Sequence, residues 1–249
     1  MGGVDNSGYI EADSALLAAA DISQSGIINA GDGGYVDVIG SLSVTVEADA
    51  VISAPGGTVV ARAAQGDTLV SGAIDVSSDD GQGGTAHVLG QRVGLLDSAT
   101  IDASGATGGG AVNVGGNFQG NGDLQNAVRT FVGSNVVINV DAVDSGDGGT
   151  AIVWSDGSTG FTGTITGRGA GFAEVSGKEA LAFNGHVDLR GHNGELGTLL
   201  LDPLDILVTT GGNPDLDGDF KDDANTQKWT GKANGTGGDE HTDDTLSDA

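Results

Sequence analysis

Residues 73–89, AIDVSSDDGQGGTAHVL, contain the unit from which most of this chain is built. A short apolar–polar–apolar run from Ile74 to Val76 precedes a glycine-rich turn that ends in Gly83–Gly84. A second alternating run follows from Thr85 to Leu89. Alternation with a period of two on both sides of a turn predicts half-buried strands and not a helix.

Copies of this unit recur along the chain. The first glycines of the clear pairs stand at positions 33, 56, 83, 109 and 148, so that the steps between them are 23, 27, 26 and 39 residues. The last step is one period plus an insertion, and weaker copies run through Ile165 and Val187. A fixed period in the twenties with one supersecondary unit per period indicates a solenoid.

A single coil of this kind cannot bury its own apolar face, so neighbouring coils have to stack and pair their strands. We therefore predict an all-β fold in which residues 1–208 form a parallel β-helix of eight or nine coils, with Ser14–Ala20 as a strand and not a helical turn. The residues predicted to face inward are Val36, Val38, Val44, Val46, Val59, Ile74, Val76, Val88, Ile101 and Val112.

Composition and charge narrow the possible functions. The chain has 249 residues with 47 glycines, 3 prolines and a net charge of −26, and the glycines exclude long helices. An acidic protein without a basic stripe is repelled by nucleic acid and by anionic lipid, so we expect neither as a partner. There is no cysteine, hence no disulfide framework, and no apolar run of 18 residues that would insert into a membrane.

Two segments depart from the repeat. Residues 117–132 interrupt the period, and we predict that they form a loop or lateral insertion beside the stack. Residues 209–249 lose the alternation and carry ten acidic residues among Gly, Thr and Asn, which predicts a disordered or lightly docked acidic tail. The first residues lack the basic start and apolar core of a signal peptide, and we expect the chain to be a piece of a longer protein.

The segment from Gly171 to Val208, GFAEVSGKEALAFNGHVDLRGHNGELGTLLLDPLDILV, closely resembles the filamentous-haemagglutinin-like large exoproteins of Gram-negative bacteria. The parts that carry the resemblance are residues 172–178, 187–191 and 197–203, and residues 152–163 are similar to the preceding coil of the same family.

The resemblance covers residues 4–208 and implies a right-handed β-helix that belongs to an adhesin exported by two-partner secretion. It also implies a location outside the cell or on the bacterial outer surface, and an outer-membrane transporter as the partner of the parent protein. A host-cell or extracellular glycan or protein would be the receptor. The family's signal peptide and amino-terminal secretion domain are not recognised in this sequence, so we expect export of a longer parent.

β-Helices also include polysaccharide lyases and hydrolases, and an enzyme acting on acidic glycans is the alternative function. Such an enzyme needs carboxylates clustered with a histidine and a basic residue. The available fragments are Asp79–Asp80, Asp141, His186 and His192, but the Arg-Ile-Lys element of pectin hydrolases is missing. Aspartate in a glycine turn is also expected for backbone capping. We therefore predict a protein without catalytic residues and without a bound organic cofactor.

One stretch after residue 208 resembles a calcium loop. Oxygen-bearing side chains alternate around a glycine at the sixth position, which is the arrangement that wraps Ca²⁺ in such loops. The predicted ligands are Asn213, Asp215, Asp217, Asp219 and Asp222. The twelfth position, where a bidentate acid is expected, is Ala224, so that an unstructured acidic run remains the alternative.

Overall fold

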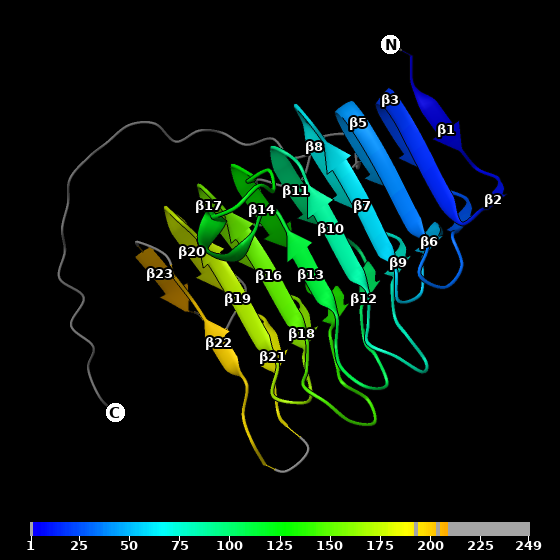
Figure 1. Cartoon of the computed structure of the whole chain (residues 1–249). Coiled ribbons are helices and arrows are strands. Elements are labelled where there is room, and N and C mark those ends of the chain that lie inside the picture. The colour runs from blue at the N-terminus through cyan, green and yellow to red at the C-terminus, as the bar shows by residue number, and fades with distance from the viewer. Residues whose placement is uncertain (1, 192–193, 203–204, 209–249) are drawn as a thin grey trace, which may run out of the picture. The chain divides into compact units, whose positions relative to one another are not determined.

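The computed structural model describes residues 2–191, 194–202 and 205–208, which form a parallel β-solenoid of about eight turns (Figure 1). Each complete turn contributes strands to two sheets, here named sheet A and sheet B. Each strand pairs in parallel with its counterpart one turn away. The predicted fold, a parallel β-helix of eight or nine coils, is confirmed.

Sheet B is the simpler of the two sheets. Its eight strands follow one another in chain order, one per turn, and each is three residues long. They are β2 (Tyr9–Glu11), β4 (Ile27–Asn29), β6 (Val51–Ser53), β9 (Ala73–Asp75), β12 (Thr100–Asp102), β15 (Val137–Asn139), β18 (Thr164–Thr166) and β21 (His186–Asp188).

Sheet A holds the other fifteen strands. Two early strands run across its whole width, and in later turns that width is divided at a corner into two strands. The strands of sheet A are β1 (Val4–Asn6), β3 (Ser14–Gln24), β5 (Tyr35–Val46), β7 (Thr58–Ala63), β8 (Asp67–Val70), β10 (Thr85–Leu89), β11 (Arg92–Leu95), β13 (Ala111–Val114), β14 (Arg129–Val132), β16 (Thr150–Ser155), β17 (Ser158–Phe161), β19 (Phe172–Gly177), β20 (Ala180–Phe183), β22 (Thr198–Leu200) and β23 (Asp205–Val208). The strand predicted over Ser14–Ala20 is therefore confirmed as part of β3.

The core is a set of aliphatic rows that run along the solenoid. In sheet B the central residue of every strand faces inward, and neighbouring turns place these residues directly over one another. This row consists of Ile10, Ile28, Ile52, Ile74, Ile101, Ile138, Ile165 and Val187. Each fully buried aliphatic side chain contributes roughly 1.5–3 kcal/mol, so the row stabilises all the turns together.

The ten residues that the sequence predicts to face inward come from both sheets and the turn after β9, and all are at most 1% exposed.

Sheet A supplies the wall of the core opposite sheet B. A typical row passes from Val38 through Ala61, Val88, Val114 and Val153 of successive turns. Valine and alanine side chains of this size keep the interior narrow, which agrees with the scarcity of aromatic residues in the chain.

The second glycine of each clear pair and two single glycines further along the chain form a column directly before the strands of sheet A. The column comprises Gly34, Gly57, Gly84, Gly110, Gly149, Gly171 and Gly197. A Cβ added at Gly110 would lie 2.1 Å from the carbonyl oxygen of Gly84, and the same clash recurs from turn to turn. The paired glycines were expected for sharp turns alone. The column shows a second reason, because the backbones of adjacent turns approach too closely for any side chain.

At the corner of sheet A, the hydroxyl group of a buried threonine donates a hydrogen bond to a backbone carbonyl group. Thr68 Oγ1 donates to Leu89 O at 2.6 Å, and Thr130 Oγ1 donates to Trp154 O at 2.6 Å. Thr159 Oγ1 donates to Ser176 O at 2.8 Å in the following turn. These hydroxyl groups are buried inside the solenoid, where an unpaired carbonyl would be costly.

The lateral insertion predicted over residues 117–132 is wrong at its carboxyl-terminal end, where the chain has already returned to the stack. Residues 129–132 form β14, which pairs with β11 on one side and β17 on the other. Thr130 and Val132 are fully buried, so they belong to the core. The excursion is residues 115–128, here named the lateral loop, and it includes the short 3-10 helix η1 (Phe118–Gly120). Residues 129–132 follow a long glycine- and asparagine-rich stretch, which concealed the strand.

The acidic tail predicted over residues 209–249 lies outside the described residues. The described part of the chain contains no helix that is long and apolar enough to cross a membrane.

Candidate functional site

The residues singled out in the sequence for chemistry are not brought together. Asn213, Asp215, Asp217, Asp219 and Asp222 of the predicted calcium loop lie outside the described residues, as does His192. His186 is exposed at the start of β21. Asp79 and Asp80 lie in the turn after β9, whereas Asp141 follows β15, two strands further along sheet B. Within residues 2–191 and 194–202, no three His, Asp or Glu side chains gather closely enough to hold a metal ion.

Many polar residues on the outside of sheet B have a structural role. The residue that ends each of five strands accepts a hydrogen bond from the backbone N–H two residues later, at 2.9–3.3 Å. These capping residues are Asn29, Asp75, Asp102, Asn139 and Asp188. Such Asx caps fix the direction in which the chain leaves the strand.

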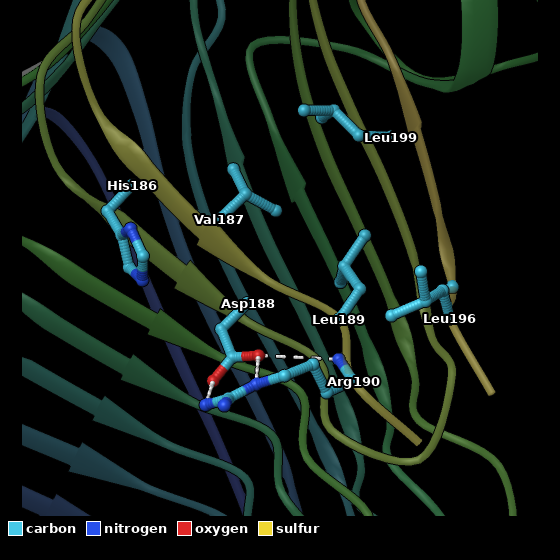
Figure 2. Close-up of a pocket in the computed structure, with 8 residues that line it drawn as sticks. His186, Val187, Asp188, Leu189, Arg190, Leu196 and Leu199 are labelled. Atoms are coloured by element: carbon cyan, nitrogen blue, oxygen red, sulfur yellow. Dashed lines mark hydrogen bonds and ion pairs between the residues drawn. The ribbon is translucent and has the colours of Figure 1, made fainter. Parts of the chain in front are cut away.

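Asp188 is also the centre of an ion cluster that joins the last turns (Figure 2). Arg190 donates to both carboxylate oxygens of Asp188, each at 2.7 Å, and Arg168 Nε donates to Oδ2 at 3.2 Å. Arg168 in turn donates its backbone N–H to Asp141 Oδ1 at 2.7 Å. Hydrogen bonds from Arg190 hold the pKa of Asp188 well below its usual range, although burial opposes them. The cluster therefore ties three turns together by charge.

Apolar side chains lie beside this cluster. Val187, Leu189, Leu196 and Leu199 line a shallow hollow next to Arg190 (Figure 2). In the described part of the chain, β21 is the last strand of sheet B, so the hollow marks the end of the described stack. Leu196 is 77% exposed, which leaves the hollow open on one side.

The lateral loop forms the most elaborate arrangement on the outer face of sheet A. It covers outward-facing residues of β16 and β19 (Figure 1). The ring of Phe118 packs edge-to-face on Phe172, with 5.8 Å between the ring centres. Gly120 lies on the indole of Trp154 so closely that a Cβ there would be 2.7 Å from the ring. The loop is thus fitted to this face and does not project from the stack.

Glu174 anchors the lateral loop from below. Its carboxylate oxygens accept the backbone N–H of Gln119 at 3.0 and 3.3 Å, and the residue is 0% exposed. Burial raises the pKa of Glu174, the hydrogen bonds from Gln119 and Ser176 lower it, and the charge of Asp202 raises it. A carboxyl group without exposed surface cannot reach a substrate, so we assign Glu174 to holding the loop.

The far end of the lateral loop reaches the corner after β7. Gln125 Nε2 donates to Ala63 O at 3.2 Å and to Ala64 O at 3.4 Å. The next residue ties the end of the loop to its middle, since Asn126 Nδ2 donates to Gly120 O at 2.8 Å and also to Asp156 Oδ1 at 3.1 Å. The loop therefore follows the outer face of sheet A across several turns.

Three charged or polar side chains next to the end of the loop have buried atoms without hydrogen-bond partners. These atoms are Asp37 Oδ1 on β5, Arg62 Nε on β7 and His87 Nδ1 on β10. Burial raises the pKa of Asp37, and the nearby charge of Arg62 opposes that shift. Burial lowers the pKa of His87, and a hydrogen bond with the Asn113 side chain opposes it. Buried polar atoms are normally paired, so this group needs an explanation.

Comparisons with known proteins identify no family for this chain. No family model matches the sequence, and no curated protein matches it. The fold is similar to that of the HMW1 secretion domain from Haemophilus influenzae, with 25% sequence identity and a TM-score of 0.49. The match covers 73% of this chain and 66% of that structure, so the chain spans a little under two thirds of its length.

Proposed function

We propose that this chain is the β-helical stalk of a secreted or surface-exposed bacterial adhesin of the filamentous-haemagglutinin-like kind, without catalysis of its own. The sequence resemblance over residues 171–208 and 152–163 supports this assignment. The receptor would be a host-cell or extracellular glycan or protein. An outer-membrane transporter would export the parent protein.

The observation that carries the proposal is the unbroken stack. From β2 to β21 every turn repeats the same inward row, and each strand of sheet B pairs only with its counterparts in the adjacent turns. Such a fold gains length along one axis as turns are added, which suits a part that holds a binding surface away from the cell. Outward acids such as Asp75 and Asp102 cap turns in this stack, since each accepts the backbone N–H two residues later.

Adhesion of beads that carry the intact chain tests the proposal. We expect the beads to bind epithelial cells or extracellular matrix, and soluble chain to compete for the binding. Beads that carry the unfolding variant Ile101→Asp are the matched control, since they present the same composition without the rod. The absence of competable adhesion to any cell or matrix surface would overturn the proposed function.

The alternative, a lyase or hydrolase of acidic glycans, is tested on the same preparation. The chain is incubated with pectin and uronate-containing glycosaminoglycans, and reducing ends and the ultraviolet absorbance of unsaturated products are followed. Product formation would replace the stalk by an enzyme. Export is tested separately by sequencing the flanking genes for an outer-membrane transporter and deleting the gene found, which should retain the parent protein inside the cell.

A further inference from the structure

The lateral loop shows what the outer face of sheet A can bind. On β19, Phe172 and Glu174 point outward two residues apart. Phe118 of the loop packs against the first of them, and the backbone N–H of Gln119 donates to the second. The loop thus offers this pair an aromatic ring followed directly by an N–H group.

An equivalent pair stands on β5. Tyr35 lies in the same row as Phe172, through Thr58, Thr85, Ala111 and Thr150 of the intervening turns. Asp37 lies in the same row as Glu174, through Val60, His87, Asn113 and Ile152. An aromatic residue and an acid two positions later therefore occur at matching places on β5 and β19.

The two pairs differ in what covers them. Beneath the lateral loop Phe172 is half-buried and Glu174 is 0% exposed, whereas Tyr35 is 45% exposed and Asp37 is half-buried. Asp37 Oδ1 is buried by its neighbours yet has no hydrogen-bond partner, which is the position that the Gln119 N–H fills at Glu174. Burial raises the pKa of both carboxyl groups. The pair on β5 has the environment of the covered pair but lacks the covering segment.

The surroundings of Asp37 provide further unpaired groups. Val60 separates Asp37 from His87 in the row, so the two polar residues are two strand spacings apart, or about 10 Å. Arg62 lies two residues beyond Val60 on the same strand. Arg62 Nε and His87 Nδ1 are both buried without partners. Val60 is therefore bordered by two free acceptors, Asp37 Oδ1 and His87 Nδ1, and by one free donor, Arg62 Nε.

We propose that this area, here named the open site and comprising Tyr35, Asp37, Arg62 and His87, binds an extended peptide segment of a second protein. An aromatic side chain of the peptide packs on Tyr35, and the following backbone N–H donates to Asp37. A carbonyl group further along the peptide accepts from Arg62, and a second N–H of the peptide donates to His87 Nδ1. The open site continues the surface that the lateral loop already covers, since the loop ends at Ala63 directly beside Arg62.

The geometry of the loop also defines which peptides fit. Gln119 has φ 52°, in the left-handed region that glycine adopts more readily than other residues. A peptide with glycine after the aromatic residue should therefore bind more tightly than one with glutamine. The chain's own loop does not compete for the open site, because tethering keeps it on Glu174 at an effective concentration in the millimolar range.

A labelled peptide is the probe for this proposal. It carries the sequence of residues 116–122, Gly-Asn-Phe-Gln-Gly-Asn-Gly, and its fluorescence anisotropy is followed as the intact chain is added. We expect saturable binding that tightens about fivefold when glycine replaces the glutamine, as expected from the roughly 1 kcal/mol that a left-handed conformation costs other residues. Binding should be lost when alanine replaces the phenylalanine. It should also be lost when the backbone nitrogen of the glutamine is methylated, because that nitrogen can then no longer donate.

Variants of the chain locate the binding. Tyr35→Ala and Asp37→Ala should each weaken binding about fivefold to tenfold, because they remove the aromatic contact and the hydrogen-bond acceptor. Tyr9→Ala and Asp5→Ala are the matched controls, since both residues are exposed elsewhere on the rod, and they should leave binding unchanged.

Several results would overturn the proposal. One such result is the absence of saturable binding, and another is equal affinities for the Tyr35 and Tyr9 variants. A third is binding of glycans, but not of peptides, that is lost in Asp37→Ala. Self-association that is abolished by Asp37→Ala would also overturn the proposal, since the occupant would then be a second copy of this chain. The proposal does not rest on adhesion, so failure of the bead assay leaves the peptide result unaffected.

Discussion

Sheet B and sheet A are built by different rules, although the same turns form both. Every strand of sheet B has three residues, an inward Ile or Val at its centre and a register that never shifts. Strands of sheet A range from three to twelve residues, and the pairing of β3 with β5 contains a register shift between Ala19 and Asp21. Sheet A also carries the lateral loop.

The difference separates the part of the chain that specifies the fold from the part that is free to vary. A one-residue slip in sheet B would move every Ile to the surface, so its pattern is strongly constrained. Outward residues of sheet A change from turn to turn, from Asp37 through His87 to Glu174. Both candidate interaction features, the covered pair and the open site, lie on this variable face.

The largest effect is expected in the row of sheet B. Ile101→Asp places an unpaired carboxylate in a continuous aliphatic row, at a cost above about 4 kcal/mol. Several turns should unfold together, because each turn is stabilised by its neighbours. Urea denaturation followed by circular dichroism measures the loss, and hydrogen exchange shows how many turns are affected. Thr100→Asp is the control, since Thr100 points outward from the same strand, and equal losses would contradict the register.

The second prediction concerns the glycine column of sheet A. Gly110→Ala introduces a Cβ 2.1 Å from Gly84 O, and a backbone atom cannot move aside as a flexible side chain can. We expect a loss at the upper end of the about 1–3 kcal/mol typical of overpacking. Gly8→Ala is the control, because the nearest atom to its added Cβ is 3.7 Å away. A denaturation midpoint that is the same for both variants would mean that the column relaxes freely.

The repeated features of the fold could be read from the sequence. Alternation around the glycine pairs predicted the strands and all ten inward residues, since burial of one face leaves a period of two. The strand β14 was missed because no glycine pair precedes it and Arg129 follows an irregular stretch. The caps at Asp75 and Asp102 were expected only in general, as acids in turns.

The outer face of sheet A was less predictable, since its contacts join distant residues. Gln119 and Glu174 are 55 residues apart, and no local pattern brings them together. One signal was present in the sequence: Tyr35 and Phe172 each follow a column glycine directly, and an acid stands two residues later in both cases. Aligning the repeats on that glycine would have matched Tyr35 with Phe172, and each following acid with the other, from the sequence alone.

A third prediction uses the two carboxylates that are most buried on the outer faces, Asp188 of sheet B and Glu174 of sheet A. Asp188 is 7% exposed and is paired with Arg168 and Arg190, which depress its pKa. Its contribution to stability is present above the pKa of an unfolded aspartate, about 4, and is lost as the pH falls below that value. Asp188→Asn keeps the cap but loses the ion pairs, so we expect a loss of about 1 kcal/mol at neutral pH.

The matched control for Asp188→Asn is Asp102→Asn, which changes the same row and the same kind of cap. Urea denaturation of both variants and the parent chain from about pH 3 to pH 7 isolates the ion pairs from the general effect of net charge. The difference between Asp188→Asn and the parent should shrink as the pH falls. A loss of equal size at both ends of the pH range would show that the arginines contribute nothing.

The smallest effect, and one of opposite sign, is expected at Glu174. Burial without a cationic partner raises its pKa, so the folded chain holds the proton more tightly than the unfolded chain does. The folded state is therefore penalised once the pH exceeds the usual glutamate pKa of about 4.3, and the penalty grows until the raised folded pKa is passed. Glu174→Gln keeps an oxygen that accepts the Gln119 N–H and removes the charge. We expect it to stabilise the chain by up to about 1 kcal/mol at neutral pH and to have no effect at low pH.

Hydrogen exchange of the Gln119 backbone N–H should stay slow in the Glu174→Gln variant, since the lateral loop remains in place. If Glu174→Gln instead destabilises the chain at neutral pH and releases the loop, the charge of Glu174 holds the loop, and the same charge at Asp37 would then dominate the open site.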